Sequence, residues 1–408
     1  MAKIKQIKSY EKIGLSELRK MKENENLIPL EDFFEAYYQC RKHKRRTHNA
    51  LMFERNYEQN LAKLWYEVNT KSYEIGESIC FLVSRPKLRE VFAADFRDRV
   101  IHHIIMMRLE PLFEEVFIED NYNCRKGKGT LYGVIRLFEQ IKEFTENYTK
   151  PCYVGKFDLC GFFMSIHKPT LWKMLEAFID EKYFGKDKEI LLYLVRKVVL
   201  HCPEKNCRRN TNKAKWKKLP KNKSLFTCGE DYGLPIGNLT SQCFANFYMH
   251  YFDLYMKQYF PFYGRYVDDY YVLASTKECI IEHVNDMDKY LRTVLKVHLH
   301  PDKIYIQDYR KGVKFVGSVV KRNRMYIGNQ TVSGMYDKIR FFNENICKEE
   351  VEHLMQSLNS YLGFLKHYKT YNIKKKMMTL IDPKWYNYIG FDVKGNDIHV
   401  VQQHDLLS

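Results

Sequence analysis

The stretch FYGRYVDDYYVL, residues 262–273, carries two adjacent carboxylates, Asp268 and Asp269, between two runs of aromatic and β-branched residues. Such runs predict two short β-strands that meet at a tight turn. Two like charges among apolar neighbours are costly to bury unless a cation neutralises them, and oxygen-only ligands favour a hard divalent ion such as Mg2+. The turn is therefore a candidate for the carboxylates of a phosphoryl- or nucleotidyl-transfer centre.

An Asp-Asp pair alone is a weak indication, because most such pairs lie in solvated turns. A third acid upstream strengthens it. The run YVGKFDL, residues 153–159, predicts a buried strand that ends at Asp158, and CGFF follows before a helix expected over about residues 168–179. The alternative is that Asp158 only caps a turn. Since Gly161 lies beside two bulky aromatics, we favour a shaped pocket in which the three acids build a two-metal site.

The motifs around these acids resemble the palm of reverse transcriptases, over roughly residues 79–320. The resemblance is ordered along the chain, which makes it specific. Its segments are RPKLREV (85–91), similar to the basic fingers hairpin; FRDRVIH (96–102), the next block; Asp158 with Phe162 and Phe163, the first palm motif; YVDD (266–269); HPDK (300–303), the lysine motif; and GVKFVG (312–317), the primer-grip turn.

One segment indicates a particular group of reverse transcriptases. GLPIGNLTSQ, residues 233–242, carries Ile236 where most reverse transcriptases have Gln, and Gln242 where they have Pro. This is similar to reverse transcriptases of diversity-generating retroelements, which copy a template RNA into cDNA with errors opposite adenines and so diversify a target gene. An apolar side chain at 236 cannot make the hydrogen bond that Gln makes near the nascent base pair. The alternative is a simple packing exchange beside Gly237.

The resemblance implies a right-hand polymerase of the α+β class, with fingers, palm and thumb, and a palm built of an antiparallel sheet packed on helices. The expected domains are an N-terminal extension (1–30), fingers with part of the palm (31–150), the palm with a basic insertion at 203–228 (151–330), and a helical thumb and tail (331–408). We expect no typical RNase H domain after the thumb.

The resemblance also implies the roles of individual residues. Two Mg2+ ions, replaceable by Mn2+, are expected, with Asp158, Asp268 and Asp269 as the catalytic acids. One of Phe162 and Phe163 is expected to exclude a 2′-hydroxyl, and the sequence leaves open which. The expected metal ligands are Asp158, Leu159, Asp268 and Asp269; the dNTP-binding residues are Arg85, Lys87, Arg89, Phe162, Phe163, Ile236, Gly237, Gln242 and Lys303; the primer grip is Phe315, Val316 and Gly317.

The charge of the chain suits a polyanionic partner. It has 67 Lys and Arg against 50 Asp and Glu, a formal net charge of +17. Neutralising phosphates releases counterions, so such an excess favours nucleic acid; the alternatives are a solubilising surface or a basic RNA-binding protein without chemistry. The insertion is either a flexible surface loop or a strand-guiding or partner-binding loop. The expected nucleic-acid contacts are Arg41, Lys42, Lys44, Arg45, Arg46, Arg125, Lys126 and Lys128.

Eleven scattered cysteines, an odd number, suit reduced intracellular thiols. A zinc site at Cys202 and Cys207 with His201 and Cys228 has the wrong ligand spacing. The start of the chain lacks an apolar signal core, and no apolar run is long enough to span a membrane. We therefore expect a cytoplasmic protein without membrane contacts, and the resemblance implies that it is bacterial or phage-encoded.

Several alternatives stay open. The chain could be a reverse transcriptase of a group II intron, a retron or a phage-defence system, or an RNA-dependent RNA polymerase, against which a phenylalanine at the sugar gate argues. The resemblance implies as partners template RNA, cDNA or primer, dNTPs, and a small basic accessory protein that forms a ring.

We also expect one long helix over residues 238–260 and a helix capped by Thr130.

Overall fold

The computed structural model describes residues 21, 24–42, 47–84, 87–394 and 397–403. The chain forms two compact units, and each is assembled from three separate segments. The first unit comprises Met1–Lys126, Phe157–Pro261 and His283–Ile304, and the second comprises Gly127–Lys156, Phe262–Glu282 and Tyr305–Ser408. None of the described helices is long and apolar enough to cross a membrane.

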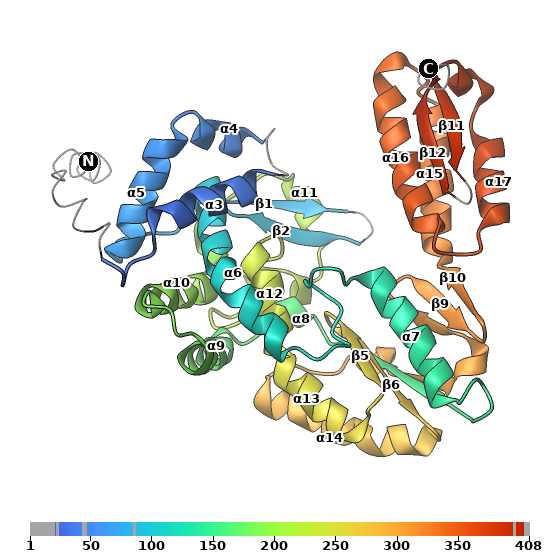
Figure 1. Ribbon diagram of the computed structural model, residues 1–408, viewed down its shortest axis with the longest axis horizontal. Coiled ribbons are helices and arrows are strands. Elements are labelled where there is room, and N and C mark those ends of the chain that lie inside the picture. Colours follow the sequence, from blue (N-terminus) through green and yellow to red (C-terminus); the bar gives the residue numbers. More distant parts are fainter. Residues whose placement is uncertain (1–20, 22–23, 43–46, 85–86, 395–396, 404–408) are drawn as a thin grey trace. The chain divides into compact units, whose positions relative to one another are not determined.

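The first unit is a set of helices with one small sheet (Figure 1). The sheet has the strand order β2-β1-β4, with β1 (Ser78–Val83), β2 (Arg89–Ala93) and β4 (Cys207–Arg209). Its main helices are α3 (Leu30–Arg41), α4 (His48–Glu54), α5 (Tyr57–Asn69), α6 (Phe96–Val116), α8 (Phe162–Ser165), α9 (Lys168–Lys182), α10 (Lys188–Leu200), α11 (Lys213–Trp216), α12 (Leu239–Tyr248) and α13 (His250–Tyr259).

The second unit contains the sheet that carries the acidic turn. Its strand order is β5-β6-β3-β7, formed by β3 (Tyr153–Phe157), β5 (Tyr263–Tyr266), β6 (Asp269–Ala274) and β7 (Tyr305–Asp308). The helix α7 (Thr130–Phe144) packs on it, because the Tyr271 hydroxyl donates a hydrogen bond to Gln140 Oε1 (3.0 Å) and the ring of Phe144 meets that of Phe262 edge-on. Strand β6 is almost wholly buried, as its run of apolar residues predicts.

The C-terminal part of the second unit has its own core. Tight antiparallel pairing joins β8 (Val313–Phe315), β9 (Ser318–Lys321) and β10 (Arg324–Ile327). Three helices and a hairpin follow, and Trp385, fully buried, lies in their shared cluster. These elements are α15 (Asn329–Asn343), α16 (Val351–Leu365), α17 (Tyr371–Leu380), β11 (Ile389–Lys394) and β12 (Asp397–Gln402); α14 (Lys277–Val294) precedes β7.

The predicted α+β class with antiparallel sheets is confirmed, and the four domain boundaries stay a prediction. The hairpin of β1 and β2 and the helix α6 lie where the sequence placed them. The single helix expected over 238–260 is wrong, because the chain breaks into α12 and α13 at Met249. The Thr130 cap is also wrong: Thr130 is the first helical residue, and Gly129 holds the cap position without a side-chain bond. The tail contains an unexpected hairpin.

Buried His102 on α6 generates a test of stability. Burial lowers the pKa of His102 from 6.5 to about 3, and its Nδ1 lies 3.1 Å from the Thr240 hydroxyl. As pH falls, His102 is therefore protonated in the unfolded chain at a higher pH than in the folded chain. We expect the free energy of unfolding to drop by about 2 kcal/mol between pH 6.5 and 5 on account of this residue. Urea unfolding of His102→Gln should show a weaker pH dependence than wild type.

Burial also raises the pKa of Asp98 to about 6, so the stabilisation from this residue is lost as pH rises. Asp98 is present in both proteins, so comparing His102→Gln with wild type cancels its contribution. The matched control is His353→Gln, since His353 is exposed. Equal pH slopes for His102→Gln and wild type would contradict the expectation.

Candidate active site

The acidic turn is a two-residue connection held by a buried arginine. Tyr266 pairs with Asp269 across β5 and β6, so that Val267 and Asp268 form the turn. Val267 has a φ of 59°, which is unfavourable for a β-branched residue. The Arg265 side chain, fully buried, donates a hydrogen bond to the Val267 carbonyl (2.9 Å). The local sequence thus fixes both carboxylates at the end of the hairpin.

Lys156 brings the end of β3 beside the start of β6. Its Nζ lies 3.0 Å from Asp269 Oδ2, and β3 and β6 are neighbours in the sheet. Asp158 is the second residue after Lys156 along the chain. Sequence reasoning missed Lys156, although alternate residues of a strand share a face, so that its position two residues before Asp158 was a usable signal.

The segment after β3 is tied to the lysine motif of the first unit. Lys303 Nζ donates a hydrogen bond to Asp158 Oδ1 (2.9 Å), and the His300 amide donates to the Asp158 carbonyl (2.9 Å). Leu159 forms an antiparallel bridge with Leu299. The structure therefore places the predicted first acid and the predicted lysine in direct contact.

Gly161 is required by a close approach and by its backbone. It has a φ of 54°, and a Cβ at this position would lie 2.9 Å from the Asn222 carbonyl oxygen. The two phenylalanines after it differ in exposure: Phe162 is only 2% exposed, whereas Phe163 is half-buried. The Leu234 amide donates to the Phe163 carbonyl (2.8 Å), which joins this turn to the GLPIGNLTSQ segment.

The GLPIGNLTSQ segment is clamped to strand β2. The Phe92 amide donates to the Ile236 carbonyl (2.8 Å). Gly237 has a φ of 118°, and a Cβ there would lie 2.8 Å from Val91 Cγ1. Ile236 and Phe163 pack against the same small core of Cys80, Phe92, Met164 and Leu225. Gln242 is exposed on α12.

The predicted triphosphate contacts lie at the hairpin of β1 and β2. Lys87 and Arg89 are exposed there, and Arg89 pairs with Val83 across the strands. Arg85 lies outside the described residues, as do Lys44, Arg45 and Arg46. The roles of all these side chains stay predictions.

The other predicted nucleic-acid contacts differ in their surroundings. Arg41 Nε donates to Glu54 Oε1 (2.6 Å), and Lys42 Nζ donates to Gln39 Oε1 (3.0 Å). Arg125 has a side chain only 5% exposed, because it binds Glu114 (2.9 Å) and donates to the Ile118 carbonyl. These contacts give Arg125 a structural role. Lys126 is exposed, and Lys128 lies over the ring of Tyr132.

The predicted primer grip is a two-residue turn between β8 and β9. Phe315 pairs with Ser318, and Val316 and Gly317 have φ values of 37° and 86°. The Phe315 ring meets the Tyr271 ring of β6 edge-on, with centroids 5.0 Å apart. The turn is thereby fixed to the sheet that carries the acidic turn.

The donor chemistry of the acids fits a hard divalent ion, because Asp158, Asp268 and Asp269 offer only carboxylate oxygens. In the structure a lysine ammonium contacts two of them, Lys303 at Asp158 and Lys156 at Asp269. Among the residues that the structure describes, no group of three or more His, Cys, Asp or Glu is arranged to hold a metal.

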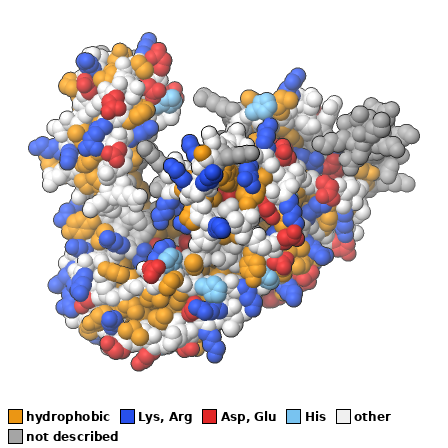
Figure 2. All heavy atoms as spheres, turned by 180° about the vertical axis from the view of Figure 1, so that it is seen from behind, with side chains coloured by type: hydrophobic (Ala, Val, Ile, Leu, Met, Phe, Trp, Pro, Cys, Tyr) orange, Lys and Arg blue, Asp and Glu red, His pale blue; other side chains and the backbone are white. Residues whose placement is uncertain are grey.

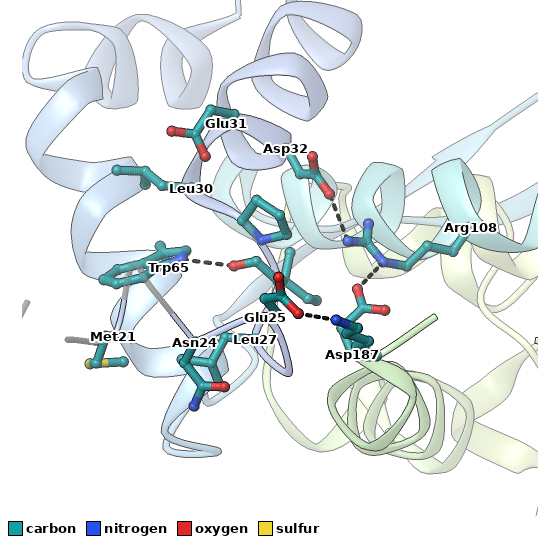
Figure 3. Close-up of a pocket in the computed structure, with 13 residues that line it drawn as sticks. Met21, Asn24, Glu25, Leu27, Leu30, Glu31, Asp32, Trp65, Arg108 and Asp187 are labelled. Carbon is teal, nitrogen blue, oxygen red and sulfur yellow. Dashed lines mark hydrogen bonds and ion pairs between the residues drawn. The ribbon is translucent and has the colours of Figure 1, made fainter. Parts of the chain in front are cut away.

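Two cavities lie in the first unit away from the acids. One, of about 500 Å³, surrounds Arg108, whose guanidinium lies between Asp32 and Asp187, at 2.6 Å from each (Figure 3). Both carboxylates are thus used to hold α3 and the start of α10 on α6. The other, of about 600 Å³, lies against the face of the β1–β2 hairpin that carries Phe81 and Val91, and Gly237 lines it.

Comparison with known proteins shows the family. The family described as reverse transcriptase (RNA-dependent DNA polymerase) matches residues 84–320, more than half of the chain. The chain belongs to this family, which confirms the enzyme class predicted from the motifs. No curated protein matches the sequence.

Solved telomerase structures are among the matches, at low sequence identity. Apo telomerase from Candida tropicalis, truncated from the C-terminal domain, has 12% identity and a TM-score of 0.45, over 62% of this chain and 55% of that chain. Telomerase from Candida albicans with a fragment of telomeric RNA has 11% identity and a TM-score of 0.44, over 80% and 61%. This chain thus spans little more than half the length of the telomerase chains that it matches.

The close approach at Gly237 generates a stability prediction. Gly237→Ala should lower the free energy of unfolding by about 1 to 3 kcal/mol, since the new Cβ meets both an unfavourable φ and the Val91 side chain. The matched control is Gly127→Ala, where φ is 76° and nothing lies within 4 Å. If chemical denaturation gave equal losses for both, the contact with β2 would not be the cause.

Proposed function

We propose that the chain is an RNA-directed DNA polymerase that copies a template RNA into cDNA, with Asp158, Asp268 and Asp269 as its catalytic acids. The observation that carries the proposal is the ion pair of Lys156 with Asp269. It holds the residue two positions before Asp158 at the acidic turn, and two residues span at most about 7 Å. The family match over residues 84–320 supports the same chemistry.

Asp158, Asp268 and Asp269, with the Leu159 backbone, would hold the two Mg2+ ions. When bound, these ions activate the primer 3′-hydroxyl and stabilise the charge of the leaving pyrophosphate. In the structure Lys156 forms an ion pair with Asp269, and Lys303 forms one with Asp158. The ammonium of Lys303, which is half exposed and contacts Asp158, supports the proposal that this lysine positions or protonates the leaving group.

The exposure of the other candidate side chains indicates which of them can contact the nucleotide. Lys87 and Arg89 present charge at the end of the hairpin, where a triphosphate can be neutralised. Phe163 is the better candidate for the sugar gate, because Phe162 is too buried to contact a nucleotide. Phe315, Val316 and Gly317 present a fixed turn for the primer strand.

We further propose that the enzyme belongs to the diversifying group and makes errors opposite adenines. The motif GLPIGNLTSQ supports this, and Ile236 packs with Phe163 against one apolar core. An amide at position 236 would add a hydrogen-bonding group beside the candidate sugar gate. Its replacement by a branched apolar side chain removes that restraint on base selection.

A small basic ring-forming accessory protein is part of this proposal. The candidate docking faces are the basic stretches at 41–46 and 208–223. Charge disfavours the stretch at 208–223, because both surfaces would be positive. The other candidate, the run at 41–46, lies mostly outside the described residues.

Loss of the acidic pair should abolish synthesis. We expect Asp268→Ala with Asp269→Ala to lower primer extension by about 10³-fold or more, because the turn then offers no carboxylate. RNA binding, measured by filter retention, should persist. The control is Glu282→Ala with Asp286→Ala, two exposed acids on α14 outside the site motifs. Undiminished extension by the double variant would refute the assignment.

Restoring the amide at position 236 should improve fidelity. Ile236→Gln is expected to reduce misincorporation opposite template adenines by about tenfold, which corresponds to one hydrogen bond of about 1.4 kcal/mol. Ile236→Leu, which stays apolar, should retain the errors. Sequencing of cDNA made on a defined adenine-containing template measures both, and identical error spectra for Ile236→Gln and wild type would count against the proposed role.

A further inference from the structure

The basic insertion, residues 203–228, is not a loose loop. Strand β4 joins it to the hairpin of β1 and β2 by parallel pairing with β1. Glu90 of β2, only 1% exposed, accepts hydrogen bonds from the Ser224 hydroxyl (2.6 Å) and from the Leu225 amide (2.8 Å). The two ends of the insertion are therefore fastened to the same sheet.

A stacked group at the centre makes the insertion rigid. The Arg209 guanidinium lies 3.6 Å from the centroid of the Phe226 ring and 5.1 Å from that of Trp216. The two rings meet edge-on, and the Trp216 indole donates to the Thr211 carbonyl (3.2 Å). Contacts of this kind hold a cation and two aromatic rings in one arrangement.

The outer surface of the insertion is strongly cationic. Residues 203–228 contain nine Lys and Arg but one acid, Glu204. Of the side chains described there, only Lys205 takes part in an ion pair, with Glu230. In Figure 1 α11 lies behind β1, and the rear view in Figure 2 shows Lys and Arg side chains grouped on that face. The exposed cations are Arg208, Lys215, Lys217, Lys218, Lys221 and Lys223.

We propose that this surface, Arg208 with Lys215–Lys223, binds the sugar-phosphate backbone of an RNA segment that lies outside the polymerising site. Like charges fixed on a rigid support repel one another, and a polyanion relieves that repulsion. Lysines are point charges without the planar fork that reads bases, so the binding is independent of sequence. The choice of RNA over an acidic protein rests on the proposed function, because the enzyme's template is an RNA.

Binding of a labelled, blunt-ended RNA hairpin, followed by fluorescence anisotropy over a range of salt concentrations, tests the proposal. The full chain with Asp268→Ala and Asp269→Ala is used, without dNTPs, so that polymerisation plays no part. The test variant adds Lys→Gln at 215, 217, 218, 221 and 223. The control variant instead adds Lys→Gln at Lys63, Lys173, Lys182, Lys186 and Lys289, five exposed lysines of the same unit.

We expect the test variant to bind the hairpin at least tenfold more weakly at 0.1 M salt, and the slope of log K against log salt to fall by about 3 to 4. The control, which loses the same net charge, should change about twofold. Equal weakening by both variants, or wild-type binding by the test variant, would overturn the proposal. Unchanged RNA binding with lost binding of polyglutamate would also overturn it, in favour of an acidic protein partner.

Two further measurements keep the outcome unambiguous. Thermal denaturation should show equal melting temperatures, because the substituted lysines make none of the anchoring contacts of Glu90 or Arg209; if they differ, Lys221→Glu with Lys223→Glu serves as the second variant. With the three acids intact, the five Lys→Gln changes should leave extension of a short primer–template unchanged. Wild-type chain that binds RNA at the insertion but fails to extend a primer would refute the proposed function alone.

Discussion

The ion pair between Lys156 and Asp269 is the contact on which the account of the site depends. A cation at the end of β3 lies against the first residue of β6, and the sheet order β5-β6-β3-β7 makes those strands neighbours. The chain reaches Asp158 two residues later, where a second lysine, Lys303, takes the carboxylate. Two of the three acids, Asp158 and Asp269, are thus each compensated by a lysine, which lowers the cost of holding these charges.

A second constraint links the nucleotide side of the site to the insertion. Phe163 and Ile236 pack on a small core that includes Leu225 and is bordered by Phe226, both from the insertion. Gly161 contacts Asn222, and Glu90 anchors Ser224. The residues proposed to select the sugar and the base therefore share their support with the surface proposed to bind RNA.

The sequence predicted the elements whose signals are local. The acidic turn follows from charge between β-forming runs, and the strand before Asp158 follows from its apolar residues. It could not predict that residues 207–209 form a strand, because one cysteine followed by two arginines carries no local strand signal and pairs only when β1 is available as a partner. The break of the expected helix at Met249 and the hairpin of the tail also depend on tertiary packing. Strand periodicity indicates that Lys156 shares a face with Asp158, although Lys156 was not among the predicted site residues.

The most direct measurement of the central claim is cleavage of the backbone by hydroxyl radicals generated at Fe2+ bound in place of Mg2+, with primer–template and dNTP present. The account predicts that both the segment around residues 158–161 and the turn at 266–269 are cut, and that Asp158→Asn suppresses both cuts. Cleavage at the turn alone, unaffected by Asp158→Asn, would contradict it.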